Sequence, residues 1–376
     1  MKSLFGFLKK LLFTKVIDKS IPFLSTTLVP VLVRFVNIFS LEHRRKKVYV
    51  SKEVARLIEF SRKYPKSSCY IFYDFSKSPK TYGDFFYSIV LARFLETLDF
   101  AVHLYLLGGN ESSNSEDDRS MKTNLDFFKE LQEIAGALTD ITTIEILLGD
   151  EVARKLVDVS KMNGFIICED LIKLNKPIYT HVFDLVNSLL DRATDSQVIA
   201  TLLNSADFAR VGISGPSTPY IAVPCRFNQM WEKQRNLSEK SFLQIIKTIQ
   251  NVFPELSVMI VSDQAGCQFF KNVAETNGLF CYFSQDYSQT FLGNGKLILK
   301  SEAWIQIKGG GIGVFAMFSK IAQLVYVVPA HEHSIREGYF GKNSSFQKFN
   351  TIYGEPSRNR LRRDLKSLRR EFKFQT

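Results

Sequence analysis

The sequence predicts an α/β protein with two parallel-sheet domains, and three observations lead to this prediction. Strand-like and helix-like segments alternate over residues 69–168 and again over 220–329, as is typical of parallel sheets covered by helices. The predicted strands end in polar or glycine-rich loops, and the carboxyl edge of such sheets is where open α/β folds bind ligands. A glycine turn at residues 308–313 separates a strand from a helix. We therefore expect two Rossmann-like domains that face each other across a cleft.

Changes in composition divide the chain into four expected segments. Residues 1–47 are basic and apolar, 48–210 form the N-terminal domain, 220–345 form the C-terminal domain, and 355–376 form a basic helix. A stretch rich in Gly, Pro and Ser, residues 208–219, is expected to link the domains.

Composition limits the classes of function. The 376 residues suffice for two domains, and the formal net charge of +11 with a pI near 9.3 favours an anionic partner: a membrane surface, a nucleotide phosphate or nucleic acid. The five cysteines include no C-x-x-C pair, which favours a reducing compartment. His331 and His333 form the only histidine cluster and lack an evident third ligand, so we expect no metal site.

The N-terminal segment is apolar enough to interact with a membrane. Residues 21–39 approach the length of a membrane span, but Pro22 and Pro30 interrupt them and Arg34 lies inside. An arginine at mid-bilayer costs about 2.5–3.5 kcal/mol even on a lenient scale. Two alternatives remain: the segment lies on an anionic membrane, or it folds onto the body of the protein.

The glycine turn is the most distinctive motif. The pattern predicts a strand over 303–307, a turn at 308–311 followed by Gly313, a helix over 314–323 and a strand over 324–328. Backbone N–H groups at such a turn bind phosphate or pyrophosphate. The alternative is that these glycines only allow the helix to approach the sheet closely.

Further polar residues lie in loops at the expected carboxyl edges of both domains. The second domain brings Arg226, Ser262, Asp263 and Ser284 to the same edge as the glycine turn. In the first domain a polar loop follows strand 69–73, and the residues we expect to contact a substrate there are Lys80, Tyr82 and Asp84. The alternative is that this loop only caps the following helix, a role that suits Asp84.

Together, the cations and the backbone N–H donors expected at this edge of the second domain suit a diphosphate ligand. Arginine makes bidentate, permanently charged contacts to phosphate oxygens. When a sugar leaves a nucleotide-diphosphate sugar, charge grows on the diphosphate, and fixed cations stabilise that transition state. No D-x-D motif is present for a metal to do this instead, so we expect no metal and no other cofactor.

The second half also resembles a known family. The segments VPCRFNQMWEKQRN (223–236), MIVSD (259–263) and SEAWIQIKGGGIGVFAMFSKIAQLVYVVP (301–329) are similar to bacterial surface-polysaccharide glycosyltransferases of the GT-B class. They also distantly resemble fucosyltransferases that use a GDP-sugar. In those enzymes an arginine soon after a C-terminal-domain strand holds the donor phosphate, and Arg226 has that position. Pro224 and Cys225 stand where those enzymes have a histidine.

The resemblance implies a donor site in the second domain and an acceptor side in the first, around Lys80, Tyr82 and Asp84. Candidates for the catalytic base are Asp84, Asp74 and His181, and Asp84 is the one we single out. The donor and phosphate set is Arg226, Arg235, Asn236, Ser262, Asp263, Lys308, Gly309, Gly310 and Gly311.

The leading hypothesis is a glycosyltransferase that moves a sugar from a nucleotide-diphosphate sugar to a polysaccharide, glycan or lipid-linked acceptor. We expect it in the cytoplasm, peripheral on the inner face of the membrane, where the basic residues of 357–376 could contact phospholipid headgroups. Alternatively, that helix docks on the protein and exposes a solvated face. The second hypothesis is a non-catalytic, membrane-associated interaction protein with a degenerate transferase fold. A nucleic-acid binder ranks last, because only charge favours it.

Overall fold

The computed structural model describes most of the chain beyond residue 51. The described residues are 52, 54–75, 81–108, 124–162, 164–168, 182–190, 192–203, 212–227, 236–307, 311–327, 347–351 and 356–371. The expected segment 1–47 therefore lies outside them. Among the described residues, no helix combines the length and apolar character needed to cross a bilayer.

The N-terminal half forms a four-stranded parallel sheet in the order β3-β2-β1-β4. Its strands are β1 (Ser68–Asp74), β2 (Ala101–Gly108), β3 (Thr143–Leu148) and β4 (Gly164–Cys168). Its helices are α4 (Tyr82–Thr97), α5 (Asn124–Leu138), α6 (Asp150–Ser160), α7 (Val182–Leu190) and α8 (Asp195–Thr201). The chain reverses its direction across the sheet between β1 and β4, which makes this pair the topological switch point.

The C-terminal half forms a six-stranded parallel sheet in the order β10-β9-β8-β5-β6-β7. Counted from β5, this is the order 3-2-1-4-5-6 of a doubly wound Rossmann fold, with its switch point between β5 and β8. The strands are β5 (Tyr220–Pro224), β6 (Ser257–Val261), β7 (Tyr282–Phe283), β8 (Ala303–Ile307), β9 (Ala322–Val327) and β10 (Gln347–Thr351).

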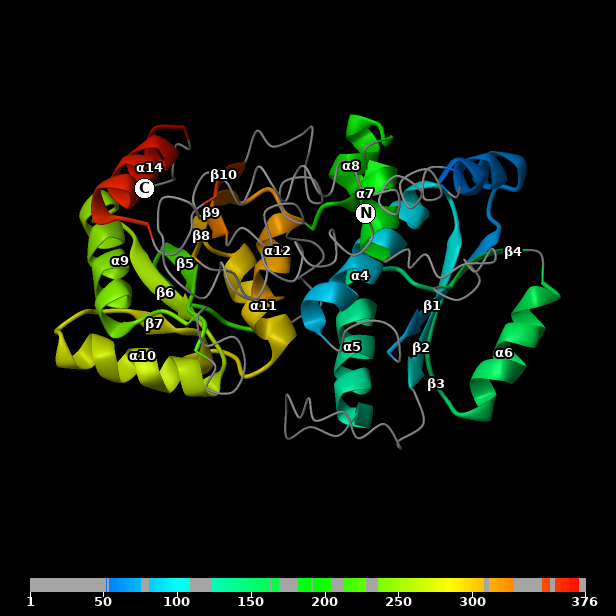
Figure 1. The fold of residues 1–376 in the computed structure, drawn as a ribbon, viewed down its shortest axis with the longest axis horizontal. Coiled ribbons are helices and arrows are strands. Elements are labelled where there is room, and N and C mark those ends of the chain that lie inside the picture. Colours follow the sequence, from blue (N-terminus) through cyan, green and yellow to red (C-terminus); the bar gives the residue numbers. More distant parts are fainter. Residues whose placement is uncertain are drawn as a thin grey trace, which may run out of the picture.

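Helices flank this sheet (Figure 1). They are α9 (Glu239–Val252), α10 (Gln264–Thr276), α11 (Phe291–Leu299), α12 (Val314–Met317) and α14 (Arg358–Glu371), with the 3₁₀ turns η4 (Ser284–Asp286) and η5 (Gly311–Gly313). The expected α/β class with two Rossmann-like domains is confirmed by the two sheets.

The structure differs from the predicted elements in the later part of the second sheet. The helix expected over 314–323 is only the four residues of α12, because Phe318 and Ser319 leave the helix to meet the N-terminal half. The Phe318 carbonyl accepts a 2.7 Å hydrogen bond from the backbone N–H of Leu203, and Leu203 pairs with Ser319 in an isolated parallel bridge. Strand β10, which the sequence analysis did not predict, extends the second sheet.

Aromatic side chains join the two halves into one continuous apolar core. Helix α4 of the first half packs against α11 and α12 of the second, in the centre of Figure 1. The Phe86 ring lies 4.9 Å from that of Phe315 and 5.7 Å from that of Phe318, and Tyr82 stacks on Phe291 at 4.1 Å. Relative motion of domains is usual where their interface is small and polar, so this apolar junction favours a fixed arrangement.

A buried arginine organises the helices of the first half. Arg93 of α4 is 8% exposed, and its guanidinium donates four hydrogen bonds to backbone carbonyls. It reaches the Leu138 carbonyl at the end of α5 and the Thr201 carbonyl at the end of α8, at 2.7 and 2.9 Å. The last carbonyls of a helix lack intrahelical partners, and a cation there also complements the helix dipole. Arg93 therefore joins three helices.

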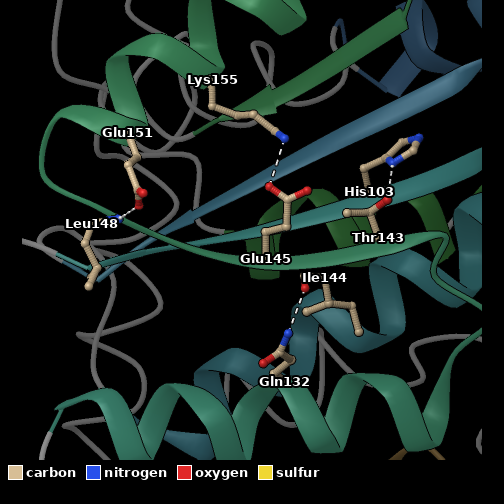
Figure 2. A network of polar contacts seen from close by, with 8 residues as sticks. All are labelled: His103, Gln132, Thr143, Ile144, Glu145, Leu148, Glu151 and Lys155. Atoms are coloured by element: carbon tan, nitrogen blue, oxygen red, sulfur yellow. Dashed lines mark hydrogen bonds and ion pairs between the residues drawn. The ribbon is translucent and has the colours of Figure 1, made fainter.

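His103 of β2 lies among polar and aromatic groups of the first sheet. Its Nδ1 is 3.1 Å from the Thr143 hydroxyl (Figure 2), and its Nε2 is 3.3 Å from the Ser68 hydroxyl. Its ring stacks on Tyr70 with the centroids 4.9 Å apart. Each ring nitrogen therefore has a hydroxyl partner that can either donate or accept.

Burial lowers the pKa of His103 below its ordinary value, and the positive charge of Lys155 lowers it further. Lys155 forms a 2.8 Å ion pair with Glu145 (Figure 2), whose charge opposes the shift. The folded protein therefore favours the neutral ring. Because the folded pKa is depressed, this stability is present above the unfolded pKa of about 6.5 and is lost as the pH falls through the folded pKa.

We expect the free energy of unfolding to decline as the pH is lowered from about 8 to about 5. His103→Gln should remove part of that decline, because the amide keeps hydrogen-bonding capacity but does not titrate in this range. Urea unfolding at several pH values measures both proteins. An identical pH dependence in the variant would contradict the assignment.

Candidate functional site

The elements that follow the two switch-point strands β1 and β8 lie next to each other. After β1 the chain enters the first turn of α4, and after β8 it enters η5. A Cβ placed on Gly83 in α4 would lie 3.6 Å from the Cα of Gly311 in η5. The backbones of the two halves thus touch at these two glycines, and the carboxyl edges of both sheets converge there.

Arg226 lies at the carboxyl edge of the second sheet, next to its switch point. It follows β5 by two residues and its side chain is half-buried. The Arg226 carbonyl accepts a hydrogen bond from the backbone N–H of Leu237 at 3.4 Å. This bond brings Arg226 close to Asn236, so two of the predicted phosphate-site residues lie at the two ends of one loop.

Ser262 fixes the backbone that precedes Arg226. Its hydroxyl donates to the Cys225 carbonyl at 2.6 Å, while the Cys225 N–H donates to the Val261 carbonyl at 3.0 Å. The buried Ser284 hydroxyl lies beside the Ser262 backbone, 3.3 Å from its carbonyl. Ser262 thus positions a neighbour of the candidate site, whatever else it contacts.

Asp263 acts as the N-cap of α10. Its Oδ1 accepts the Gly266 backbone N–H at 2.7 Å, which satisfies one of the unpaired donors of the first turn. The side chain is exposed. A Cβ on Gly266 would lie 2.0 Å from the Ser262 hydroxyl, so this glycine leaves the space in which Ser262 sits.

On the first half, Tyr82 and Asp84 both make contacts within the protein. Thr81 is the N-cap of α4: its Oγ1 accepts the Asp84 N–H at 3.0 Å and donates to the Asp84 carboxylate at 2.5 Å. The Tyr82 hydroxyl donates to the Glu130 carboxylate. Burial, and then the hydrogen bond to Glu130, raise the pKa of Tyr82, so its phenol stays protonated near neutral pH.

The glycine turn has a packing role at one of its positions. A Cβ on Gly313 would lie 2.1 Å from Oε1 of Gln306, which is 1% exposed and accepts the Trp304 indole N–H at 3.2 Å. A Cβ on Gly311 would instead meet only ordinary contacts with Gly83, at 3.6 and 4.0 Å. Close approach to the sheet therefore explains Gly313 but does not explain Gly311.

We expect Gly313→Ala to lower the free energy of unfolding by about 1–3 kcal/mol, because the added methyl group displaces the buried amide of Gln306. Gly311→Ala is the matched control and should change stability little. Chemical denaturation compares the two. Equal effects of both substitutions would contradict the packing role of Gly313.

Several predicted site residues lie outside the described residues, and the structure does not place them relative to the others. These are Lys80, His181, Arg235, Lys308, Gly309 and Gly310. The remaining base candidate, Asp74, ends β1 at the switch point of the first sheet and is half-buried. No cluster of three or more His, Cys, Asp or Glu side chains that could hold a metal ion is present in the part of the chain that the structure describes.

Sequence reasoning missed three residues at the junction: Thr81, Glu130 and Phe291. Thr81 had a detectable signal, because Thr followed three residues later by an acidic residue is typical of a helix N-terminus. Glu130 and Phe291 had none, since each meets Tyr82 only through the tertiary fold.

The fold and this edge-to-edge junction define a two-domain Rossmann-like protein. No family model and no curated protein matches the chain. Among solved structures, it is similar to the ADP-heptose LPS heptosyltransferase II of E. coli (TM-score 0.48, 10% identity, 80% of this chain and 98% of that chain). It is also similar to a glycosyl transferase family 9 protein of Veillonella parvula (TM-score 0.46, 8% identity, 76% of this chain and 86% of that chain). A third similar structure is the UDP-GlcNAc 2-epimerase of Neisseria meningitidis (TM-score 0.43, 10% identity, 80% of this chain and 91% of that chain). These similarities concern overall architecture.

Proposed function

We propose that the protein transfers a sugar from a nucleotide-diphosphate sugar to a glycan, polysaccharide or lipid-linked acceptor. One observation carries the proposal: helix α4 and the turn η5, which follow the switch-point strands β1 and β8, contact each other at Gly83 and Gly311. Ligands of open α/β sheets bind outside the carboxyl ends of the strands at the switch point. A group transfer requires two substrates within reacting distance, and converging carboxyl edges supply one place for both.

The donor's diphosphate is assigned to the second half. Arg226 follows β5, and the turn that contains Gly311 follows β8, the neighbouring strand. A guanidinium and backbone N–H groups would neutralise the charge that develops on the leaving diphosphate. We also propose that the transfer needs no metal ion, so a chelator should leave the rate unchanged.

The acceptor is assigned to the first half, where Asp84 and Asp74 are the candidates for the base that accepts its hydroxyl proton. Asp84 lies in the first turn of α4, next to Gly83, and accepts the Thr81 hydroxyl. Asp74 ends β1, at the edge where the switch point lies. A base must come within hydrogen-bonding distance of the proton, and both positions provide that opportunity.

The test is titration calorimetry of the full chain with ADP-, GDP-, UDP- and dTDP-sugars, followed by a transfer assay with the donor that binds. We expect one nucleotide class to bind and to protect the protein against thermal unfolding. Folded protein that binds none of them would overturn the proposal.

A second candidate function is a non-catalytic interaction protein with a degenerate transferase fold. The observation that favours it is that Tyr82 and Asp84 are engaged by Glu130 and Thr81 within the protein. It predicts association with membranes without nucleotide binding, so the same titration separates the two functions.

We further propose a cytoplasmic protein that is peripheral on the inner face of the membrane. The net charge of +11 and the basic, apolar residues 1–47 support this location. A lipid-linked acceptor would be presented at that surface.

A further inference from the structure

Helix α14 carries a row of cations outside the proposed site. Arg358, Arg362, Lys366 and Arg370 are all exposed and recur every fourth residue. We call these four residues the basic stripe. Each step of four residues advances about 40° around a helix and about 6 Å along it, so the stripe covers a sector of about 120° and a length of about 18 Å.

The apolar side of α14 is already covered. Leu361, Leu365 and Leu368 are fully buried in the core that α14 shares with α9. The helix is therefore docked on the second sheet (Figure 1), and its leucines are not available to enter a bilayer. Whatever binds this helix must bind its charged face.

The acidic groups beside α14 have other partners. Asp364 accepts the Tyr326 hydroxyl at 2.9 Å, and Glu255 forms a 2.9 Å ion pair with Arg369. Arg360 and Arg363 also lie within ion-pair distance of Asp364. Across the residues that the structure describes, no ion pair involves a member of the basic stripe.

We propose that the basic stripe binds the headgroups of an anionic phospholipid bilayer by charge alone. A docked helix presents its cations in a fixed row, which suits a broad anionic surface. Single-stranded nucleic acid is less suited, because its binding sites combine cations with aromatic side chains on which bases stack, and α14 has no aromatic residue. The inference rests on the membrane location proposed above, but not on glycosyl transfer.

The experiment is cosedimentation of the full chain with vesicles of phosphatidylcholine, with or without phosphatidylglycerol. The test variant is R362Q/K366Q. The matched control is K129Q/R154Q, which removes two exposed cations from α5 and α6 of the other half. Each Lys or Arg near an anionic surface is worth about 1 kcal/mol, so the test variant should partition about 30-fold less well at low salt. The control should lose much less, and R362K should bind like the wild type.

Three results would overturn the proposal. The test and control variants could lose binding equally; wild-type binding could be the same with and without phosphatidylglycerol; or a single-stranded RNA homopolymer could displace the protein from the vesicles at low concentration. Unfolding curves of both variants show whether each is folded. Nucleotide-sugar binding by the test variant should be unchanged, so a loss of vesicle binding alone is distinguishable from a failure of the proposed transfer.

Discussion

Arg226→Ala is expected to lower kcat/KM for sugar transfer by about 10²–10³-fold, the usual effect of removing one preorganised donor that stabilises transition-state charge. The physical reason is the position of Arg226 after β5, beside the switch point, where the leaving diphosphate is proposed to lie. Arg226→Lys should recover only part of the rate, because an ammonium group keeps the charge but not the bidentate geometry. Steady-state kinetics with the donor found by titration measures both variants.

The control for Arg226 is Arg154→Ala, which removes an exposed arginine from α6 of the other half. We expect it to leave both kcat and KM unchanged. If Arg226→Ala remains folded and transfers sugar at the wild-type rate, the donor diphosphate is not held by this residue. Because the backbone of Arg226 is fixed through Cys225 and Ser262, circular dichroism should show no change in fold.

Arg93→Met is expected to lower the free energy of unfolding by about 3–5 kcal/mol, the largest effect on stability that we predict. Methionine retains apolar bulk but removes four hydrogen bonds, of 2.7 to 3.3 Å, from the carbonyls of Leu138, Ala200, Thr201 and Leu202. The carbonyls of Leu138, Thr201 and Leu202 would then be buried without this donor. Urea unfolding followed by far-UV circular dichroism gives the change.

The free energy of unfolding of Arg93→Lys should lie between those of Arg93→Met and the wild type, because one ammonium group cannot reach carbonyls at the ends of both α5 and α8. The exposed Arg154→Met is the control and should change stability by less than about 0.5 kcal/mol. A loss of less than about 1 kcal/mol in Arg93→Met would show that water or rearranged carbonyls replace the guanidinium.

The alternation of strand-like and helix-like segments was sufficient to predict two parallel sheets, although strand β10 of the second sheet was missed. β8 has the predicted bounds of 303–307, because a short buried apolar run followed by a glycine-rich turn leaves little freedom in where the strand ends. The helix after it was predicted too long. The residue types at 318–323 are compatible with a helix. However, the contact of Phe318 and Ser319 with Leu203 takes up backbone groups that a helix would use. That contact joins residues more than one hundred positions apart, which no local pattern reveals.

The candidate site was predictable in part. The positions of Arg226 and Ser262 at a carboxyl edge follow from their places directly after strands of a parallel sheet, which the alternating segments predict. The engagement of Tyr82 by Glu130 and Phe291 does not, because those residues lie on other elements and approach Tyr82 only in the folded protein.

The sequence by itself determined the class of fold, the glycine turn and the basic character of the C-terminal helix, because these depend on periodicity and on residue type. Only the tertiary structure decided that Gly83 and Gly311 touch, that Gly313 makes room for Gln306, and that α14 buries its leucines against α9. The physical reason is that packing depends on distances between segments far apart in the chain, whereas periodicity records only how each segment divides its side chains between core and solvent.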